Sequence, residues 1–374
     1  GKKKMKNKKE RLIVTSPTGC FMVNPETGNV KTVLEKGNTE GYFGIAYYEG
    51  KIVVAARTNL GTKKPAKSST DTTLYSVDPG TLKASKVLDV YGLSDVHQIA
   101  VLNQYLLITD TWNNRLGVVN LDTQKFVCWL NIGKLRSDVN HINSVFVTNE
   151  KILLTLNNRG YTTDLLQLRT KDILTGIEKK SEKKLPGKIL KLNKVSHSHD
   201  ILPYGDDLLL STSCHGYIYS FKNKRPKFFT SKAAHQKEGL NEFFRQMLYK
   251  VFKYLKFKVV PPRVKLSFNE EAQNSFVKRI LMKIDWFFNL IPKVYEMVFL
   301  KDKGMFHKDV WSRGMDFTSH GLWVGFSPYA KRQERNSTKL VASVGLFSTK
   351  DFSLVKKIEL PGASQVYDVR TVLK

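Results

Sequence analysis

Short stretches in which apolar and polar residues alternate recur along the chain, and six of them share one ungapped spacing. These are Phe43-Gly44-Ile45-Ala46, His97-Gln98-Ile99-Ala100, Asn143-Ser144-Val145-Phe146, His199-Asp200-Ile201-Leu202, His320-Gly321-Leu322-Trp323 and Tyr367-Asp368-Val369-Arg370. Nine residues after the start of four of these stretches, three apolar residues are followed by a small one. These segments lie at 52–55, 106–109, 152–155 and 208–211. Alternation with period two predicts β-strands, and the short turns between paired stretches predict hairpins.

Further alternating segments give each repeat four antiparallel strands in about 45 residues, a length typical of a β-propeller blade. The two chain ends share one repeat. Residues 366–370 match a first strand, and residues 12–15 match a second strand. The sequence therefore predicts an all-β fold, a six-bladed β-propeller closed by its N- and C-terminal strands. Such closure removes exposed sheet edges.

The repeat is interrupted between blades five and six, where residues 231–314 follow a different period. Apolar residues recur there at helical spacing, with Lys interleaved among Phe, Tyr, Trp and Leu. We expect a basic amphipathic helical insertion at 231–314, a basic disordered tail at 1–10, and the propeller at 11–230 and 315–374.

The net charge of +28 lies mainly in the tail, the insertion and residues 179–194, outside the repeated strands. For the insertion, two roles remain open: a cap over the propeller mouth, or an interfacial helix pair whose residues 240–300 contact an anionic membrane. Nucleic-acid binding is disfavoured, because Lys outnumbers Arg 47 to 14 and no nucleic-acid-binding module is recognisable.

The cysteines and the apolar runs of the sequence indicate in which cellular compartment the protein is expected. The three cysteines are widely spaced and form no CxxC pair, which excludes a disulfide framework and a zinc finger and fits a reducing compartment. No apolar run has the length of a membrane span, and the apolar segment after the N-terminal lysines is too short for a signal peptide. We expect a cytoplasmic protein, with a peripheral membrane position as the alternative.

Histidines concentrate on the strands that we expect to line the channel. The first strand of each blade faces the axis, so the aligned positions place His97, His199 and His320 in one ring. Side chains two positions earlier point the same way and add His141 and His197 as a second layer. Such a cluster can bind a divalent metal, with zinc or iron as the expected ion. The structural alternative is that these imidazoles bond only to one another, the backbone and water.

Other polar residues near the axis suggest further roles. Asp95 can act as a general base or orient a ligand histidine, and Tyr367 can donate a proton or contact substrate. A solvated Asp and a packed Tyr are the structural alternatives. The candidates for binding an anionic substrate are Asn143, Arg57, Arg159 and Arg370.

The stretches at 95–100 and 140–145 carry a resemblance to known propellers. The spaced inner strands, the terminal closure and the axial histidines resemble six-bladed propellers of the NHL, SMP-30 and peptidyl-amidating-lyase type. The stretches at 95–100 and 140–145 also look like an uncharacterised bacterial propeller family with HD and HLN inner-strand motifs, a resemblance that covers mainly blades three to five, although Gln98 stands where that family usually has an acid. In the lyase branch channel histidines bind zinc, so the resemblance implies a propeller and a metal site.

Two functions follow as hypotheses. The first is a metal-dependent enzyme, a lyase, hydrolase or oxygenase, that uses the histidine cluster on an anionic or membrane-associated substrate. The second is a non-catalytic propeller that binds a glycan, lipid or protein partner, with structural histidines. The sequence contains no Gly-rich phosphate loop, nucleophile elbow or HExxH motif that would assign another chemistry.

Overall fold

The computed structural model describes residues 10–58, 71–133, 140–157, 163–192, 195, 197–213, 216–229, 311–328, 330 and 334–373. All of them belong to the first of two units into which the chain divides, Gly1–Thr230 together with Lys308–Lys374. The second unit, Ser231–His307, lies outside the described residues, as do the expected helical insertion before Trp311 and the tail before Glu10.

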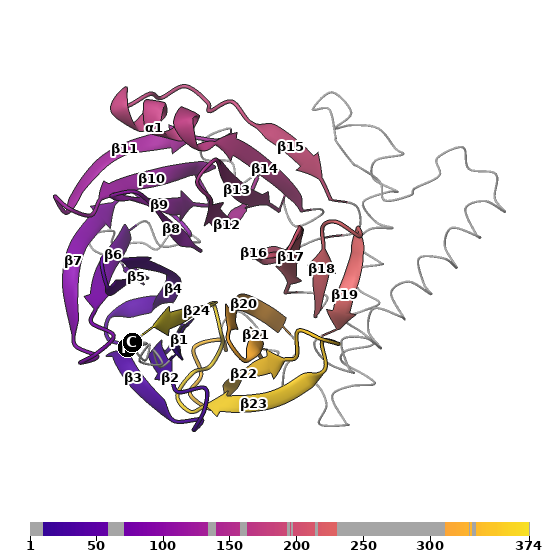
Figure 1. Cartoon of the computed structure of the whole chain (residues 1–374). Coiled ribbons are helices and arrows are strands. Elements are labelled where there is room, and N and C mark those ends of the chain that lie inside the picture. Colours follow the sequence, from indigo (N-terminus) through magenta and orange to yellow (C-terminus); the bar gives the residue numbers. More distant parts are fainter. Residues whose placement is uncertain are drawn as a thin grey trace, which may run out of the picture. The chain divides into compact units, whose positions relative to one another are not determined.

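Six four-stranded antiparallel sheets are arranged around a common axis in this unit (Figure 1). Blade 1 contains β24 (Asp368–Leu373), β1 (Glu10–Ser16), β2 (Gly19–Val23) and β3 (Val30–Glu35). Blade 2 contains β4 (Thr39–Tyr48), β5 (Lys51–Thr58), β6 (Asp71–Val77) and β7 (Ala84–Tyr91). Blade 3 contains β8 (Ile99–Leu102), β9 (Tyr105–Asp110), β10 (Arg115–Asn120) and β11 (Lys125–Asn131).

Blade 4 contains β12 (Ile142–Val147), β13 (Lys151–Leu156), β14 (Asp164–Arg169) and β15 (Lys188–Lys191). Blade 5 contains β16 (Ser198–Tyr204), β17 (Asp207–Thr212), β18 (Tyr217–Ser220) and β19 (Arg225–Phe229). Blade 6 contains β20 (Trp311–Thr318), β21 (Gly321–Ser327), β22 (Ala342–Phe347) and β23 (Leu354–Leu360). The innermost strands are β24, β4, β8, β12, β16 and β20, and each contacts the inner strands of both neighbouring blades.

The chain ends close the ring as the sequence predicts. Strand β24 pairs antiparallel with β1, with Ile13 opposite Arg370, so blade 1 takes its inner strand from the C-terminus. The all-β, six-bladed fold is thereby confirmed.

The hydrophobic core lies between the blades. Each of six buried clusters combines residues of two adjacent blades, because each pleated sheet buries one face against each neighbour. The added helix of blade 4, α1 (Thr170–Glu178), extends one cluster by burying Ile173 and Ile177 beside Leu130 and Leu185. Among the described residues no helix is long and apolar enough to cross a membrane.

A β-bulge marks the aligned position in four inner strands. The pairing register shifts around Phe43, Asn143, His199 and Arg313, so these residues have no direct partner on the second strand. A bulge turns its extra side chain away from the regular alternation. The aligned residue and the one after it can therefore both face the axis, which simple alternation would not allow.

Blade 6 follows a different register from the one that the sequence pattern predicts. Met315 pairs with Val324, as Ile45 pairs with Val54 and Val145 with Leu154, so the aligned residue of blade 6 is Arg313. His320 lies in the exposed turn between β20 and β21, and Thr318 ends β20. The prediction that His320 belongs to the channel ring is corrected, because the stretch 320–323 opens the second strand of the blade and not the first.

Candidate functional site in the propeller channel

The inner strands place one ring of mixed chemistry around the axis. In blade order its members are Tyr367, Phe43, His97, Asn143, His199 and Arg313. Several contacts join ring members: Phe43 stacks on Tyr367 with centroids 4.4 Å apart, and the His97 ring lies 6.1 Å from Phe43 and 5.6 Å from His199. The ring therefore has an aromatic and cationic side at blades 6, 1 and 2, and an imidazole side at blades 3 to 5.

Three potential metal ligands converge at the imidazole side. Among the described residues, Asp95, His97 and His141 are the group whose ligand atoms all lie within 4.8 Å of one another. The Asp95 Oδ2 atom is 3.6 Å from His97 Nε2, and the rings of His97 and His141 are 5.6 Å apart. The Asp95 and His97 side chains are 14% and 15% exposed, so solvent reaches both.

The backbone that presents these ligands adopts an unusual conformation. Asp95, His141 and His197 occupy equivalent positions, two residues before the ring, and have φ values of 57°, 45° and 54°. Asp and His tolerate this left-handed region better than most residues, but it still carries a cost of order 1–3 kcal/mol each. Such residues cluster at functional sites, where the surrounding fold holds them.

Arg57 fixes the position of Asp95. Its Nη2 atom lies 2.8 Å from Asp95 Oδ1, and its Nε and Nη2 both donate to the Val96 carbonyl. The guanidinium also lies 3.6 Å above the Phe43 ring. With Oδ1 held by Arg57, Oδ2 is the oxygen on the side of His97, which is the arrangement expected of a positioned carboxylate ligand.

Electrostatics keep the carboxylate charged and the imidazole neutral. Burial opposes ionisation of Asp95, yet the charge of Arg57 and the adjacent His97 hold its pKa far below the usual range. Burial lowers the pKa of His97 to about 4, despite the opposing effect of Asp95. Burial, together with the charge of Arg313, lowers the pKa of His199 well below the usual value. Neutral imidazole is the form that binds metals.

His199 and Asn143 extend the site. Asn143 Nδ2 is 3.3 Å from His199 Nδ1 and 3.4 Å from His199 Nε2, and Asn143 is 1% exposed. The Asn143 Oδ1 atom is buried and has no hydrogen-bond partner among the described residues. An orphaned buried acceptor at ring level points to a bound water or ligand donor.

A hydrogen-bonded floor fills the channel at the next residue of each inner strand. Polar side chains alternate there with small ones around the ring. Gln98, Asp200 and Asp368 each accept the backbone N–H of the following blade, at Val145, Met315 and Ile45. The blades between them contribute Gly44, Ser144 and Gly314, and a Cβ on Gly314 would stand 2.5 Å from Val369 N. Small residues make room because six long side chains do not fit around one axis.

Arg370 completes this floor and is not placed to anchor a substrate by itself. It donates Nη1 to Asp200 Oδ2 at 2.8 Å and Nη2 to Asp200 Oδ1 at 3.0 Å, and it lies 3.1 Å from Asp368 Oδ1. Gln98 Nε2 of blade 3 also donates to Asp200 Oδ1 of blade 5 at 3.0 Å. Burial raises the pKa of Asp368, against the charge of Arg370. The network thus joins all six blades.

The predicted site residues therefore separate into groups. Asp95, His97 and His141 come together, with His199 and Asn143 beside them, whereas His320 is remote and exposed. His197 lies in the layer before the ring, where its carbonyl accepts from Ser213 and its charge would lower the pKa of His199. Tyr367 packs flat on Phe43 in the aromatic half. Arg159 lies outside the described residues.

Arg313 is a ring residue that was not expected from the sequence, although the sequence carries a signal for it. Nine residues beyond Arg313 stands Leu322-Trp323-Val324-Gly325, an apolar triplet that ends in a small residue like the others. No such apolar segment begins nine residues after His320. This difference favours Arg313 over His320 as the aligned residue of blade 6.

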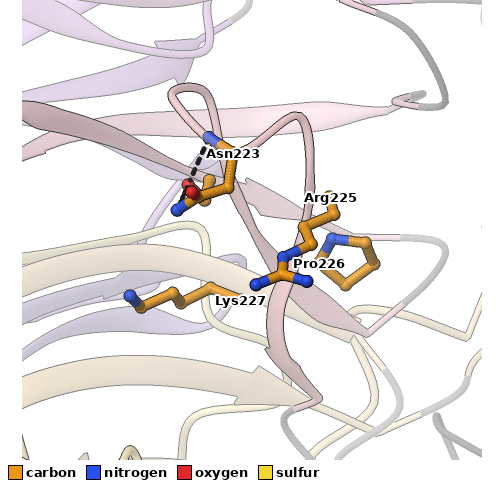
Figure 2. Close-up of a pocket in the computed structure, with 5 residues that line it drawn as sticks. Asn223, Arg225, Pro226 and Lys227 are labelled. Carbon is orange, nitrogen blue, oxygen red and sulfur yellow. Dashed lines mark hydrogen bonds between the residues drawn. The ribbon is translucent and has the colours of Figure 1, made fainter.

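A separate cavity of about 270 Å³ lies at the outer edge of blade 5 (Figure 2). Its lining comes from the end of β18, the β18–β19 turn and β19, and consists of Ser220, Asn223, Arg225, Pro226 and Lys227. Asn223 donates from its backbone and its side chain to Ser220 Oγ, so the turn is held internally. None of these residues belongs to the channel ring.

Comparisons with known proteins extend to the fold alone. No family model matches the chain, and no curated protein matches it significantly in sequence. A protein of unknown function from Bacteroides caccae is similar in structure, with a TM-score of 0.50 and 8% identity over 97% of this chain and 98% of the other. A chain of a nidogen/laminin complex matches at a TM-score of 0.33 and 10% identity, over 60% of this chain and 95% of that one.

Proposed function

We propose that this propeller is a metal-dependent enzyme whose ion is held by Asp95, His97 and His141. The observation that carries the proposal is the convergence of their three ligand atoms within 4.8 Å at a solvent-reachable point of the channel. Two imidazoles and one carboxylate form a ligand set used by zinc hydrolases and by non-haem iron oxygenases. Three protein ligands leave coordination positions for water or substrate.

The residues fit a divalent ion in charge as well as in position. Asp95 is anionic and His97 is neutral near pH 7, so neither needs to change its protonation state to coordinate. Arg57 plays the role of an outer partner, because it holds one carboxylate oxygen and leaves the other for the ion. Zinc and iron both suit this donor set, which defines the expected cofactor.

The chain's own residues supply binding and orientation around that point. A bound ion would polarise a substrate oxygen or lower the pKa of a bound water. His199 lies next to His97 and is neutral, so a nitrogen of its ring can accept a hydrogen bond from a substrate group. Asn143 Oδ1 is a buried acceptor that can orient a donor. These roles are compatible with a lyase, a hydrolase or an oxygenase, and the resemblance to the peptidyl-amidating-lyase type favours the first.

Metal content tests the proposal. The wild-type protein, purified without chelators, should contain about one zinc or iron per chain by plasma mass spectrometry. His97→Ala and His141→Ala should each lose most of the metal. His320→Ala is the matched control, because His320 is exposed in a turn away from the ring, and it should retain the metal. Absence of metal from the wild type, or equal loss in all three variants, rejects the proposal.

A non-catalytic propeller is the second candidate, and a specific contact favours it. Asn143 Nδ2 lies within 3.4 Å of both ring nitrogens of His199, as expected where imidazoles serve packing and hydrogen bonding. Such a propeller would bind a glycan, lipid or protein partner. Protein that is metal-free as purified, and whose thermal stability falls in a His97→Ala, His199→Ala double variant although no metal is lost, would support it.

We further propose that the basic segments recruit the enzyme to an anionic surface in the cytoplasm. The support is compositional, since residues 240–300 interleave Lys with apolar and aromatic residues. Pelleting with liposomes that contain anionic lipid should require residues 231–307. Binding that is absent, or that ignores salt, would reject this part of the proposal.

A further inference from the structure

The outer strand of blade 5 differs from other outer strands at its β-bulge. In blades 1, 2, 3, 5 and 6 the pairing of the third strand with the fourth skips one residue of the fourth strand. The skipped residue is a valine in four of these blades: Val33, Val87, Val127 and Val355. In blade 5 it is Lys227. A charged residue thus stands where the same structural position is apolar elsewhere in the molecule.

Lys227 lines the cavity at the edge of blade 5 together with Arg225 and Asn223 (Figure 2). Arg225 and Lys227 are exposed, and neither forms a salt bridge with any residue that the structure describes. The Lys227 Nζ atom lies 5.2 Å from the centroid of the Phe352 ring. The cavity therefore holds two cations whose charge is available to a ligand.

The turn before β19 holds an amide donor beside these cations. Asn223 donates to Ser220 Oγ from its backbone N–H at 3.1 Å and from Nδ2 at 2.9 Å. Ser220 Oγ donates in turn to Asp207 Oδ2, and Asp207 Oδ1 accepts the backbone N–H of Lys222. These bonds fix the turn before any ligand arrives. The Asn223 amide carries a second N–H, so it can also donate to a ligand.

The local charge favours an anion in this cavity. Residues 220–229 contain no acidic residue and four basic ones, Lys222, Lys224, Arg225 and Lys227. The carboxylates of the preceding hairpin are engaged, because Asp206 pairs with Lys222 and Asp207 accepts the hydrogen bonds of the turn. A guanidinium can bind two oxygens of one anion, and an ammonium adds a point charge. Together they complement a doubly charged oxyanion.

We propose that Arg225, Lys227 and Asn223 form a binding site for a phosphate group at the outer edge of blade 5. A phosphate dianion offers separate oxygens to the guanidinium, the ammonium and the amide, and the cavity of about 270 Å³ has room for it. The phosphate belongs either to a soluble phosphate ester or to a phosphorylated lipid headgroup, which share this chemistry. The site lies outside the channel ring, so it rests neither on the proposed metal nor on residues 231–307.

Inorganic phosphate is the first probe. The full-length protein is titrated with sodium phosphate by calorimetry, at constant ionic strength and at a pH where phosphate is doubly charged. Saturable binding is expected, and Arg225→Gln and Lys227→Val should each weaken it about five- to tenfold, because each removes one charged donor. Valine is the residue of four other blades at this bulge, so the fold should tolerate Lys227→Val.

Lys31→Gln is the matched control. Lys31 is exposed on β3 and stands two residues before the bulge at Val33, as Arg225 stands two residues before Lys227. It has the same place in its blade but lacks the second cation, and its replacement should leave phosphate binding unchanged.

Vesicles identify the source of the phosphate. Phosphatidylcholine vesicles carry either phosphatidic acid, which ends in a phosphate, or phosphatidylserine, at equal surface charge. Attraction by the other basic segments is common to both. Weaker binding of Lys227→Val to the phosphatidic acid vesicles alone supports the site with a lipid as the source. Lys227-dependent binding of inorganic phosphate, with equal vesicle binding by wild type and variant, supports the site with a soluble ester as the source.

Three results overturn the site. The first is that neither inorganic phosphate nor phosphatidic acid vesicles show binding that depends on Lys227. The second is unchanged phosphate affinity in both Arg225→Gln and Lys227→Val. The third is that Lys31→Gln weakens phosphate binding as much as Arg225→Gln does, because the effect then reflects the total charge of the protein and not this cavity.

Discussion

Replacement of Asp200 by Asn tests the polar floor of the channel. The Asp200 side chain is 1% exposed and accepts hydrogen bonds from Gln98, the Met315 amide and both terminal nitrogens of Arg370. Asn has the same shape but removes the charge and places an NH₂ group against donors. Arg370 then remains largely buried without its main partner.

The magnitude follows from the ion pair. Removing one partner of a buried pair costs about 3–5 kcal/mol, and the hydrogen bonds lost to a charged acceptor belong to the same total. For a domain of this size, the fall in melting temperature is expected to be roughly 5–10 °C. Because the network joins blade 1, where the chain closes, to the others, unfolding should remain a single transition.

Urea unfolding followed by circular dichroism measures this cost. The double variant Asp200→Asn, Arg370→Gln should be more stable than the sum of the single effects predicts, with a coupling of at least about 1.5 kcal/mol. Asp206→Asn is the control, because Asp206 is 77% exposed in its pair with Lys222 and its replacement should lower the stability far less than Asp200→Asn does. A loss of unfolding free energy for Asp200→Asn as small as that for Asp206→Asn would refute the conclusion that the polar floor of the channel stabilises the propeller.

Two further predictions concern Arg57 and Gly314. Arg57→Met should leave the fold intact but weaken metal affinity about 10–100-fold, because Asp95 loses the partner that orients it; unchanged affinity in competition with a chelator would contradict this. Gly314→Ala should destabilise by more than about 2 kcal/mol, because its φ of 70° disfavours a side chain and the new Cβ would meet Val369 N at 2.5 Å. Gly28→Ala, at a φ of 78° with nothing within 4 Å, should cost only about 1 kcal/mol, and equal melting temperatures of the two variants would exclude the backbone contact as the cause.

Residues near the axis differ in how far the sequence could place them. His97 and His199 begin repeated stretches, and His141 stands two residues before a third. Each of these stretches is followed nine residues later by a recognisable apolar segment, so the convergence of the three histidines on the channel could be expected. The pairing of Arg57 with Asp95 could not, because it joins β5 of one blade to the residues that lead into the next blade's inner strand. Likewise, the selection of Asp95, His97 and His141 from a larger set depends on distances between blades.

The sequence by itself determined the repeated strands, the six blades and the closure by the two chain ends, because period-two alternation and turn residues are local signals. Only the tertiary structure decided which residues face one another across the channel. A bulge shifts the register by an extra residue without changing the apolar pattern, and so Arg313, not His320, enters the ring. The tertiary structure also explains why Gln98, Asp200 and Asp368 alternate with small residues around the ring. Six long side chains do not fit around one axis, so every second blade contributes a small residue.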